Sequence, residues 1–202
     1  MLTLASRSSV LSHGRTARIA GLFMLISVLQ GCAVATVVAV TAGVTMVADR
    51  RSFSKQIEDQ RIEFIAHNEL NKQKALTKNT NLHVVSLNGT VLVVGQAPNS
   101  YLRDLAIKTI QDVPNIVTIH NQIRISATTA ITTQSNDIWL TSKVKSALFA
   151  NSEINAKDVK VVTENSEVFL LGLVTREEAN IAVEITRNIN GVSRVFKVFE
   201  YI

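Results

Sequence analysis

The sequence predicts an α+β fold of two tandem domains, each a three-stranded sheet with two helices on one face. The stretch from Leu82 to Gly95 is repeated 77 residues later, from Val159 to Gly172. Each copy has β-branched residues on both sides of a turn pair, Asn88-Gly89 or Asn165-Ser166, which predicts a two-stranded hairpin. Helical periodicity before and after each hairpin completes the pattern.

The elements follow in the order helix, strand, strand, helix, strand in both copies. Apolar residues three and four apart predict helices before and after each hairpin, and a break at Pro114-Asn115 or Asn190-Gly191 precedes a closing strand. The short segment over 126–134 is small and polar, as expected of a linker. The expected helices cover 54–71, 99–112, 135–149 and 176–188, and the closing strands cover 116–125 and 192–202.

The N-terminal region has the layout of a secretory signal. Arg7, Arg15 and Arg18 precede a run from Ile19 to Val47 that holds no charged residue. All 16 acidic residues lie beyond this run, so removal of residues 1–31 leaves 18 basic against 16 acidic residues and lowers the net charge from +5 to +2. Such a balance lacks the dominant basic surface of a nucleic-acid-binding protein.

The only cysteine lies within this run, in Leu29-Gln30-Gly31-Cys32, which resembles the lipobox of bacterial lipoproteins. The resemblance implies a signal peptide over 1–31, acylation of Cys32 and a lipidated tether over 32–53. Ala33, where inner-membrane lipoproteins carry Asp, implies sorting to the outer membrane. Two alternatives stay open at this point: Ile19 to Ala48 is long enough to span a bilayer uncleaved, and Cys32 could be an unmodified residue.

The repeated unit resembles the BON domain, a module found in pairs in bacterial periplasmic proteins. Gly95 and Gly172 match its characteristic strand glycine, and Gly191 lies where its closing strand begins. The resemblance implies BON domains over 54–125 and 135–202. Asp49-Arg-Arg-Ser52, Ser135-Asn-Asp-Ile-Trp139 and the run from Thr163 to Arg176 further resemble two-domain lipoproteins of this family that are associated with division and outer-membrane stress.

No residue pattern predicts an enzyme, a metal site or a cofactor site. His67, His83 and His120 lack the spacing of metal ligands. Glu177 and Glu178 fall in the first turn of an expected helix, where carboxylates complement the helix dipole. We therefore expect a binding protein.

The expected helix over 135–149 carries two large apolar residues away from its apolar face of Leu140, Val144 and Leu148. Ile138 and Trp139 lie on either side of that face. At the corresponding place the first copy has Gln60-Arg61, so we expect such a patch in the second domain alone.

An exposed aromatic residue beside cations is typical of membrane-surface contact. The BON resemblance implies that this helix contacts anionic phospholipid, phosphatidylglycerol or cardiolipin. The expected contact residues on this helix are Ile138, Trp139, Ser142, Lys143 and Lys145. Two alternatives remain: the same helix or a free sheet edge could bind an envelope protein, and Trp139 could pack against the linker or the first domain.

Overall fold

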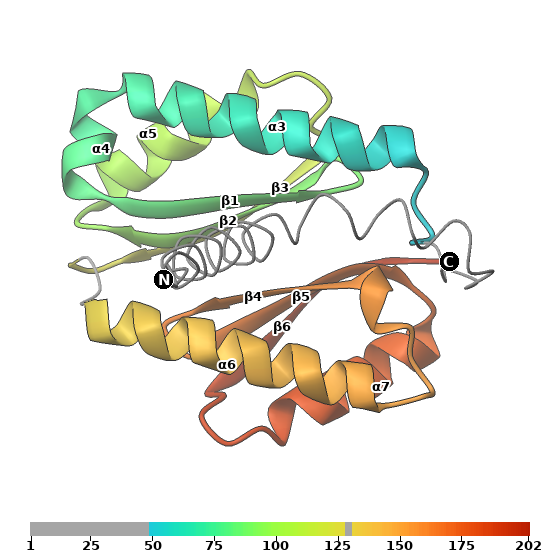
Figure 1. Cartoon of the computed structure of the whole chain (residues 1–202). Helices are drawn as coiled ribbons and strands as arrows, with labels where there is room; N and C mark the ends of the chain where they lie inside the picture. Colours follow the sequence, from blue (N-terminus) through green and yellow to red (C-terminus); the bar gives the residue numbers. More distant parts are fainter. Residues whose placement is uncertain (1–48, 128–130) are drawn as a thin grey trace, which may run out of the picture. The chain divides into compact units, whose positions relative to one another are not determined.

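The computed structural model describes residues 49–127 and 131–202, which form two sheets of three strands with helices packed on each (Figure 1). The predicted signal peptide, Cys32 and most of the predicted tether lie outside the described residues. Within the described ranges, no helix has the length and apolar character needed to cross a membrane. The elements are α3 (Phe53–Lys72), α4 (Lys74–Asn79), β1 (Asn81–Leu87), β2 (Thr90–Ala97), α5 (Ser100–Gln111), β3 (Thr118–Ile125), α6 (Ile131–Ala150), η1 (Ala156–Asp158), β4 (Val159–Glu164), β5 (Glu167–Val174), α7 (Arg176–Arg187) and β6 (Arg194–Tyr201).

Both sheets have the same topology, which confirms the predicted fold class. In each sheet the hairpin strands pair antiparallel, and the closing strand pairs parallel with the second hairpin strand. The parallel pairing requires a crossover, which α5 and α7 provide. The middle strand of each sheet is therefore the second strand of the hairpin, β2 or β5.

The helices cover one face of each sheet (Figure 1). In the first domain, the apolar sides of α3 and α5 pack on alternate residues of β2, such as Val91 and Val93. In the second domain, α6 and α7 pack in the same way on Val168 and Leu170 of β5. Each domain therefore has its own hydrophobic core between its helices and its sheet.

The opposite faces of the two middle strands are also buried. Leu92 and Val94 of β2 belong to one apolar cluster with Phe169 and Leu171 of β5. A strand that is apolar on both faces is typical of a sheet covered on both sides. The two sheets thus bury their second faces against each other, a contact that the sequence analysis did not predict.

Polar pairs surround this apolar cluster. Arg124 of β3 forms an ion pair with the buried Glu167 of β5. Gln96 of β2 donates a hydrogen bond to Glu164 of β4, and burial raises the pKa of that carboxyl group. These contacts satisfy polar groups that would otherwise be left unpaired at the edge of the cluster.

The strand glycines Gly95 and Gly172 allow close backbone contacts. A Cβ atom on Gly95, whose φ is +124°, would lie 1.9 Å from the carbonyl oxygen of Asn81. At Gly172 the corresponding distance, to the carbonyl oxygen of Asp158, is 2.5 Å. Gly191, with φ +107°, lies in the turn before β6. A side chain at any of the three positions is therefore disfavoured.

Three details differ from the sequence expectations. Helix α6 begins at Ile131, so the end of the expected linker is helical. The short helices α4 and η1 were not predicted, since neither is long enough to show a helical period. The closing strands begin two residues later than expected, at Thr118 and Arg194.

Candidate functional site

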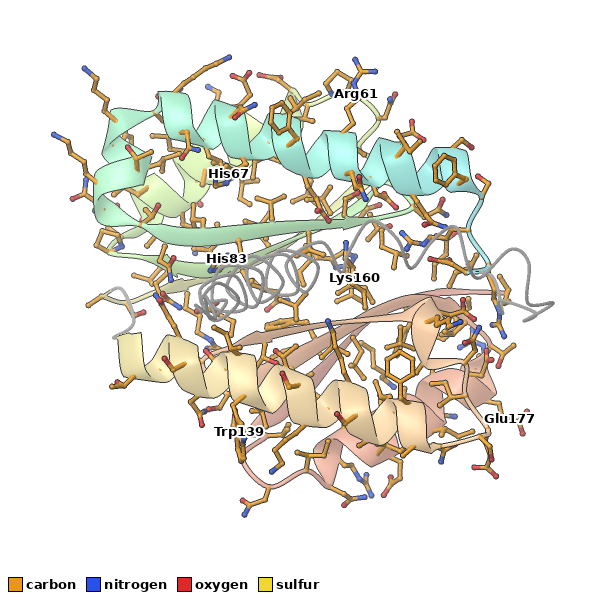
Figure 2. The ribbon with its side chains drawn as sticks, viewed as in Figure 1. Arg61, His67, His83, Trp139, Lys160 and Glu177 are labelled. Carbon is orange, nitrogen blue, oxygen red and sulfur yellow. The ribbon has the colours of Figure 1, made fainter. Side chains whose placement is uncertain are left out.

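The outer surface of α6 exposes the two apolar residues singled out by the sequence. Ile138 is 70% exposed and Trp139 is 57% exposed, whereas Leu140, Val144 and Leu148 are buried in the core. The expectation that Ile138 and Trp139 lie off the core is confirmed. Figure 2 shows the Trp139 side chain projecting from the N-terminal half of α6. Trp139 is therefore an exposed residue and not a core residue.

Asp137 fixes the N-terminal half of α6 on the hairpin turn of its own domain. Its carboxylate accepts hydrogen bonds from the backbone amides of Asn165, at 2.7 Å, and Ser166, at 2.8 Å. Both turn residues have positive φ, which directs successive amides toward one acceptor. Since Asp137 is buried and bound in this way, the next two side chains along the helix are held facing outward.

Lys143 holds the indole in place. Its ammonium group lies 4.3 Å from the centroid of the Trp139 ring, a cation–π contact, and also donates a hydrogen bond to the carbonyl of Asn190 at 3.1 Å. This arrangement orders Trp139 before any partner binds. It also means that Lys143 has contacts within the domain and does not act only as a surface cation.

The other two residues of the expected site, Ser142 and Lys145, are both exposed and differ in their contacts within the helix. Lys145 is exposed. The Ser142 hydroxyl donates to the Ile138 carbonyl at 3.0 Å, one turn earlier in the helix. Phe149, 61% exposed near the end of α6, was not singled out by the sequence analysis. Angular position on the helix could have shown it, since it lies about 20° from Ile138 at roughly 100° per residue.

The first domain also exposes apolar residues, which corrects the expectation that such a patch occurs in the second domain alone. Phe53, Ile57 and Phe64 of α3 are 77%, 51% and 66% exposed. They lie within about 40° of one another around the helix, opposite the buried face. Arg61 is exposed nearby, on the outer side of α3 (Figure 2). The comparison of Gln60-Arg61 with Ile138-Trp139 missed this stripe because its residues occupy other positions of the helix.

Asp59 of α3 corresponds to Asp137 of α6 but makes more contacts. It is buried and accepts hydrogen bonds from the turn amides of Asn88, at 2.8 Å, and Gly89, at 3.0 Å. The hydroxyl of Ser86 donates to it at 2.8 Å, and Arg51 forms an ion pair with it at 2.8 Å. The first helix of each domain is therefore fastened to its hairpin by a carboxylate at the same place.

The last residues of the predicted tether are bound to both domains. The Arg50 guanidinium forms a two-pronged ion pair with Glu178, with N–O distances of 2.7 and 2.6 Å, and contacts Asp158 at 3.1 Å. Arg51 instead binds Asp59 of the first domain. The Arg50 contact lowers the pKa of Glu178 to about 2. The tether thus ends in a fixed position, which was not expected from the sequence.

Over 49–127 and 131–202, no cluster of histidine, cysteine or acidic side chains is arranged to hold a metal ion. Glu177 is exposed in the first turn of α7 (Figure 2). Glu178 completes a capping box with Thr175, a structural role of this first-turn carboxylate that was not predicted beside the expected complement to the helix dipole.

Comparison with known proteins agrees with the repeated architecture. The model of the BON domain family matches residues 58–127 and 136–201. The chain is 38% identical over 174 residues to "Outer membrane lipoprotein DolP" of Haemophilus influenzae, covering 86% of this chain and 90% of that protein. It is 37% identical over 158 residues to a "21 kDa hemolysin" of Actinobacillus pleuropneumoniae, covering 78% of this chain and 81% of that protein.

Among solved structures, one match is the C-terminal domain of CdsD, a structural protein of the type III secretion system of Chlamydia trachomatis. The match covers 75% of this chain and 100% of that domain. The identity is 10% and the TM-score 0.29, too low to support any conclusion. Neither sequence relative carries the name of an enzyme.

Proposed function

Because the chain belongs to the BON domain family and is similar over most of its length to an outer-membrane lipoprotein, we propose that it binds anionic phospholipid. In this proposal Cys32 anchors it to the periplasmic face of the outer membrane, and the first helix of the second BON domain meets the lipid. It thereby supports outer-membrane integrity, at division sites. Phosphatidylglycerol and cardiolipin are the proposed ligands.

The observation that carries the proposal is the exposed pair Ile138 and Trp139 beside lysines. An amphipathic indole suits the boundary between headgroups and acyl chains. Burial of such a side chain contributes about 1.5–3 kcal/mol. Lys145 is exposed on the same helix and would meet a lipid phosphate, and a cation near an anionic membrane contributes about 1 kcal/mol.

A second candidate function is docking of an envelope protein without direct lipid recognition. The observation that favours it is the stripe of Phe53, Ile57 and Phe64 on α3, which has an aromatic residue at each end. Large apolar residues gathered on one exposed side of a helix can mark an interaction surface. The stripe lacks the paired lysines of α6, so an anionic membrane is a poorer match for it.

Vesicle binding separates the two candidates. The chain from residue 33 onward lacks the acylation site and retains all described residues, which form one compact unit. We expect it to bind phosphatidylglycerol vesicles more tightly than phosphatidylcholine vesicles, and to weaken as salt rises because salt screens the lysines. An equal absence of binding to both vesicles would favour the protein-docking candidate.

The anchor is tested separately in cells. Cys32→Ala removes the only thiol of the chain, so we expect an unprocessed or released protein. Fractionation of the envelope and the mass of the product measure this. Recovery of the variant in the outer membrane with normal processing would show that Cys32 is not the anchor.

A further inference from the structure

A cavity of about 230 Å³ lies at the C-terminal end of α6, remote from Trp139. Its floor is apolar and buried, formed by Leu87 of β1 together with Leu148, Ala156 and Val159 of the second domain. Phe149 stands at its rim and is 61% exposed. Trp139 lies ten residues earlier in the helix, about 15 Å away along its axis at roughly 1.5 Å per residue. The cavity therefore lies away from Trp139, although it shares Lys145 with the surface proposed to meet the membrane.

Four cationic side chains and one carboxylate line the same cavity. The cations are Arg51, Lys145, Lys157 and Lys160, and the carboxylate is Asp158. Asp158 is already bound by Arg50, through its backbone amide and its guanidinium at 3.1 Å each, and by the Asn155 side chain at 2.8 Å. The Asp158 carboxylate is therefore paired with Arg50 and Asn155 and not with the lysines that line the cavity.

The cations differ in their contacts. Arg51 is paired with Asp49 and Asp59, and Lys160 with Glu63 at 2.7 Å (Figure 2 labels Lys160). None of these three carboxylates lines the cavity. Lys145 is exposed at the rim on the same helix as Phe149, one turn earlier. An anion at the mouth would meet the two exposed lysines, Lys145 and Lys157, before the less exposed Arg51 and Lys160, which are paired with carboxylates.

We propose that this cavity binds one molecule of an anionic amphiphile, with its charged group at Lys145 and a short length of hydrocarbon on the apolar floor. A volume below the roughly 300 Å³ of small-ligand pockets accommodates a headgroup or the end of a chain, and excludes an entire two-chain phospholipid. The ligand's charge can be a phosphate, from a phospholipid, or a carboxylate, from a fatty acid. Binding in this cavity does not require insertion of Trp139 into a bilayer.

The test uses dissolved monomers and the chain from residue 33 onward. Dihexanoyl-phosphatidylglycerol below its micelle concentration represents the phospholipid source, and octanoate represents the fatty acid source. Binding is followed by NMR of the methyl groups of Leu148, Ala156 and Val159, with the Trp139 indole as the remote reporter. We expect saturable shifts of these methyls with at least one of the two probes, and smaller shifts at the indole.

Two further probes define the chemistry. Dihexanoyl-phosphatidylcholine has the same chains without net charge, and inorganic phosphate has the charge without a chain. Equal binding of the phosphatidylcholine would overturn the role of the lysines, and equal binding of phosphate would overturn the role of the apolar floor. Shifts centred on Trp139, or no shifts at the cavity methyls, would overturn the proposal outright.

Variants of the chain locate the charge. Lys145→Glu should weaken binding of the anionic probe by at least about fivefold, the effect of losing one surface charge contact. Lys78→Glu, an exposed lysine of α4 that does not line the cavity, is the matched control and should leave affinity unchanged. Equal losses would show that only the overall charge matters, and would reject the cavity.

A second variant leaves every cation in place. Ala156→Leu fills the floor and should abolish binding while Lys145 remains exposed; binding that persists in a folded Ala156→Leu protein would contradict the proposal. Failure of the chain to bind vesicles, with monomer binding at the cavity intact, would reject the membrane function alone. Vesicle binding without any response of the cavity methyls would reject the cavity alone.

Discussion

The first helices of the two domains, α3 and α6, have the same structural role and different outer surfaces. Asp59 and Asp137 each accept the amides of a hairpin turn whose asparagine has positive φ. On their exposed sides, α3 has the stripe of Phe53, Ile57 and Phe64, whereas α6 has Trp139 in contact with Lys143. The repeat therefore preserves how the helix is attached, and leaves its outer surface to differ between domains.

The largest expected effect concerns the two attaching carboxylates. Asp59→Ala should lower the free energy of unfolding by about 3–5 kcal/mol, because it leaves three hydrogen-bond donors without their buried acceptor and removes one of the two carboxylates paired with Arg51. Asp137→Ala, which removes an acceptor from two amides, should lose about 1–3 kcal/mol. Urea unfolding measures both. A larger loss of stability for Asp137→Ala than for Asp59→Ala would contradict the conclusion that Asp59 makes the stronger attachment.

Alanine substitutions at the two strand glycines should also destabilise the first domain more than the second, by a smaller difference. Gly95→Ala places a Cβ at 1.9 Å from a backbone oxygen and requires positive φ, so we expect a loss of about 2–4 kcal/mol. Gly172→Ala meets a 2.5 Å contact without positive φ, and should lose about 1–3 kcal/mol. Thermal unfolding compares the variants, and equal losses would show that φ at Gly95 contributes little.

The smallest effect should come from the Arg50 contact, which only the second domain makes. Because the folded-state pKa of Glu178 lies at about 2, below its ordinary value of 4.5, the ionised carboxylate stabilises the fold above pH 4.5. That contribution is lost as the pH falls from about 4.5 to about 2. Glu178→Gln should therefore be less stable than the unmodified chain near neutral pH and nearly equal to it at pH 2.

Glu177→Gln is the control for this pH dependence. Glu177 is exposed in the same first turn of α7, so its variant should follow the stability profile of the unmodified chain. Melting temperatures recorded from pH 7 to pH 2 compare the three proteins. A Glu178→Gln profile parallel to that of the unmodified chain would contradict the assigned contact.

Local sequence features predicted the secondary structure of the two repeated domains. The turn pairs, the hairpin strands and the helices around them follow from spacing and turn chemistry, which act over a few residues. The exposure of Ile138 and Trp139 also followed from angular position on one helix.

Contacts between distant segments could not be predicted in this way. The pairing of Arg50 with Glu178 joins residues 128 positions apart, and no local pattern specifies such a partner. The burial of the second sheet faces did leave a signal, since Val91 to Val94 and Val168 to Leu171 are apolar without alternation. The stripe on α3 was missed because only the Gln60-Arg61 position of that helix was compared with α6.

The most direct test of the asymmetry is the affinity of two matched variants for phosphatidylglycerol vesicles. Trp139→Glu and Phe64→Glu each place a carboxylate where the first helix of a domain has an exposed aromatic residue. We predict at least a tenfold loss for Trp139→Glu, because burial of the indole contributes about 1.5–3 kcal/mol. Phe64→Glu, like Arg61→Glu, should lose less than about twofold, with both proteins folded. Equal losses for the two aromatic variants, or a larger loss for Phe64→Glu, would contradict the assignment of the lipid surface to the second domain.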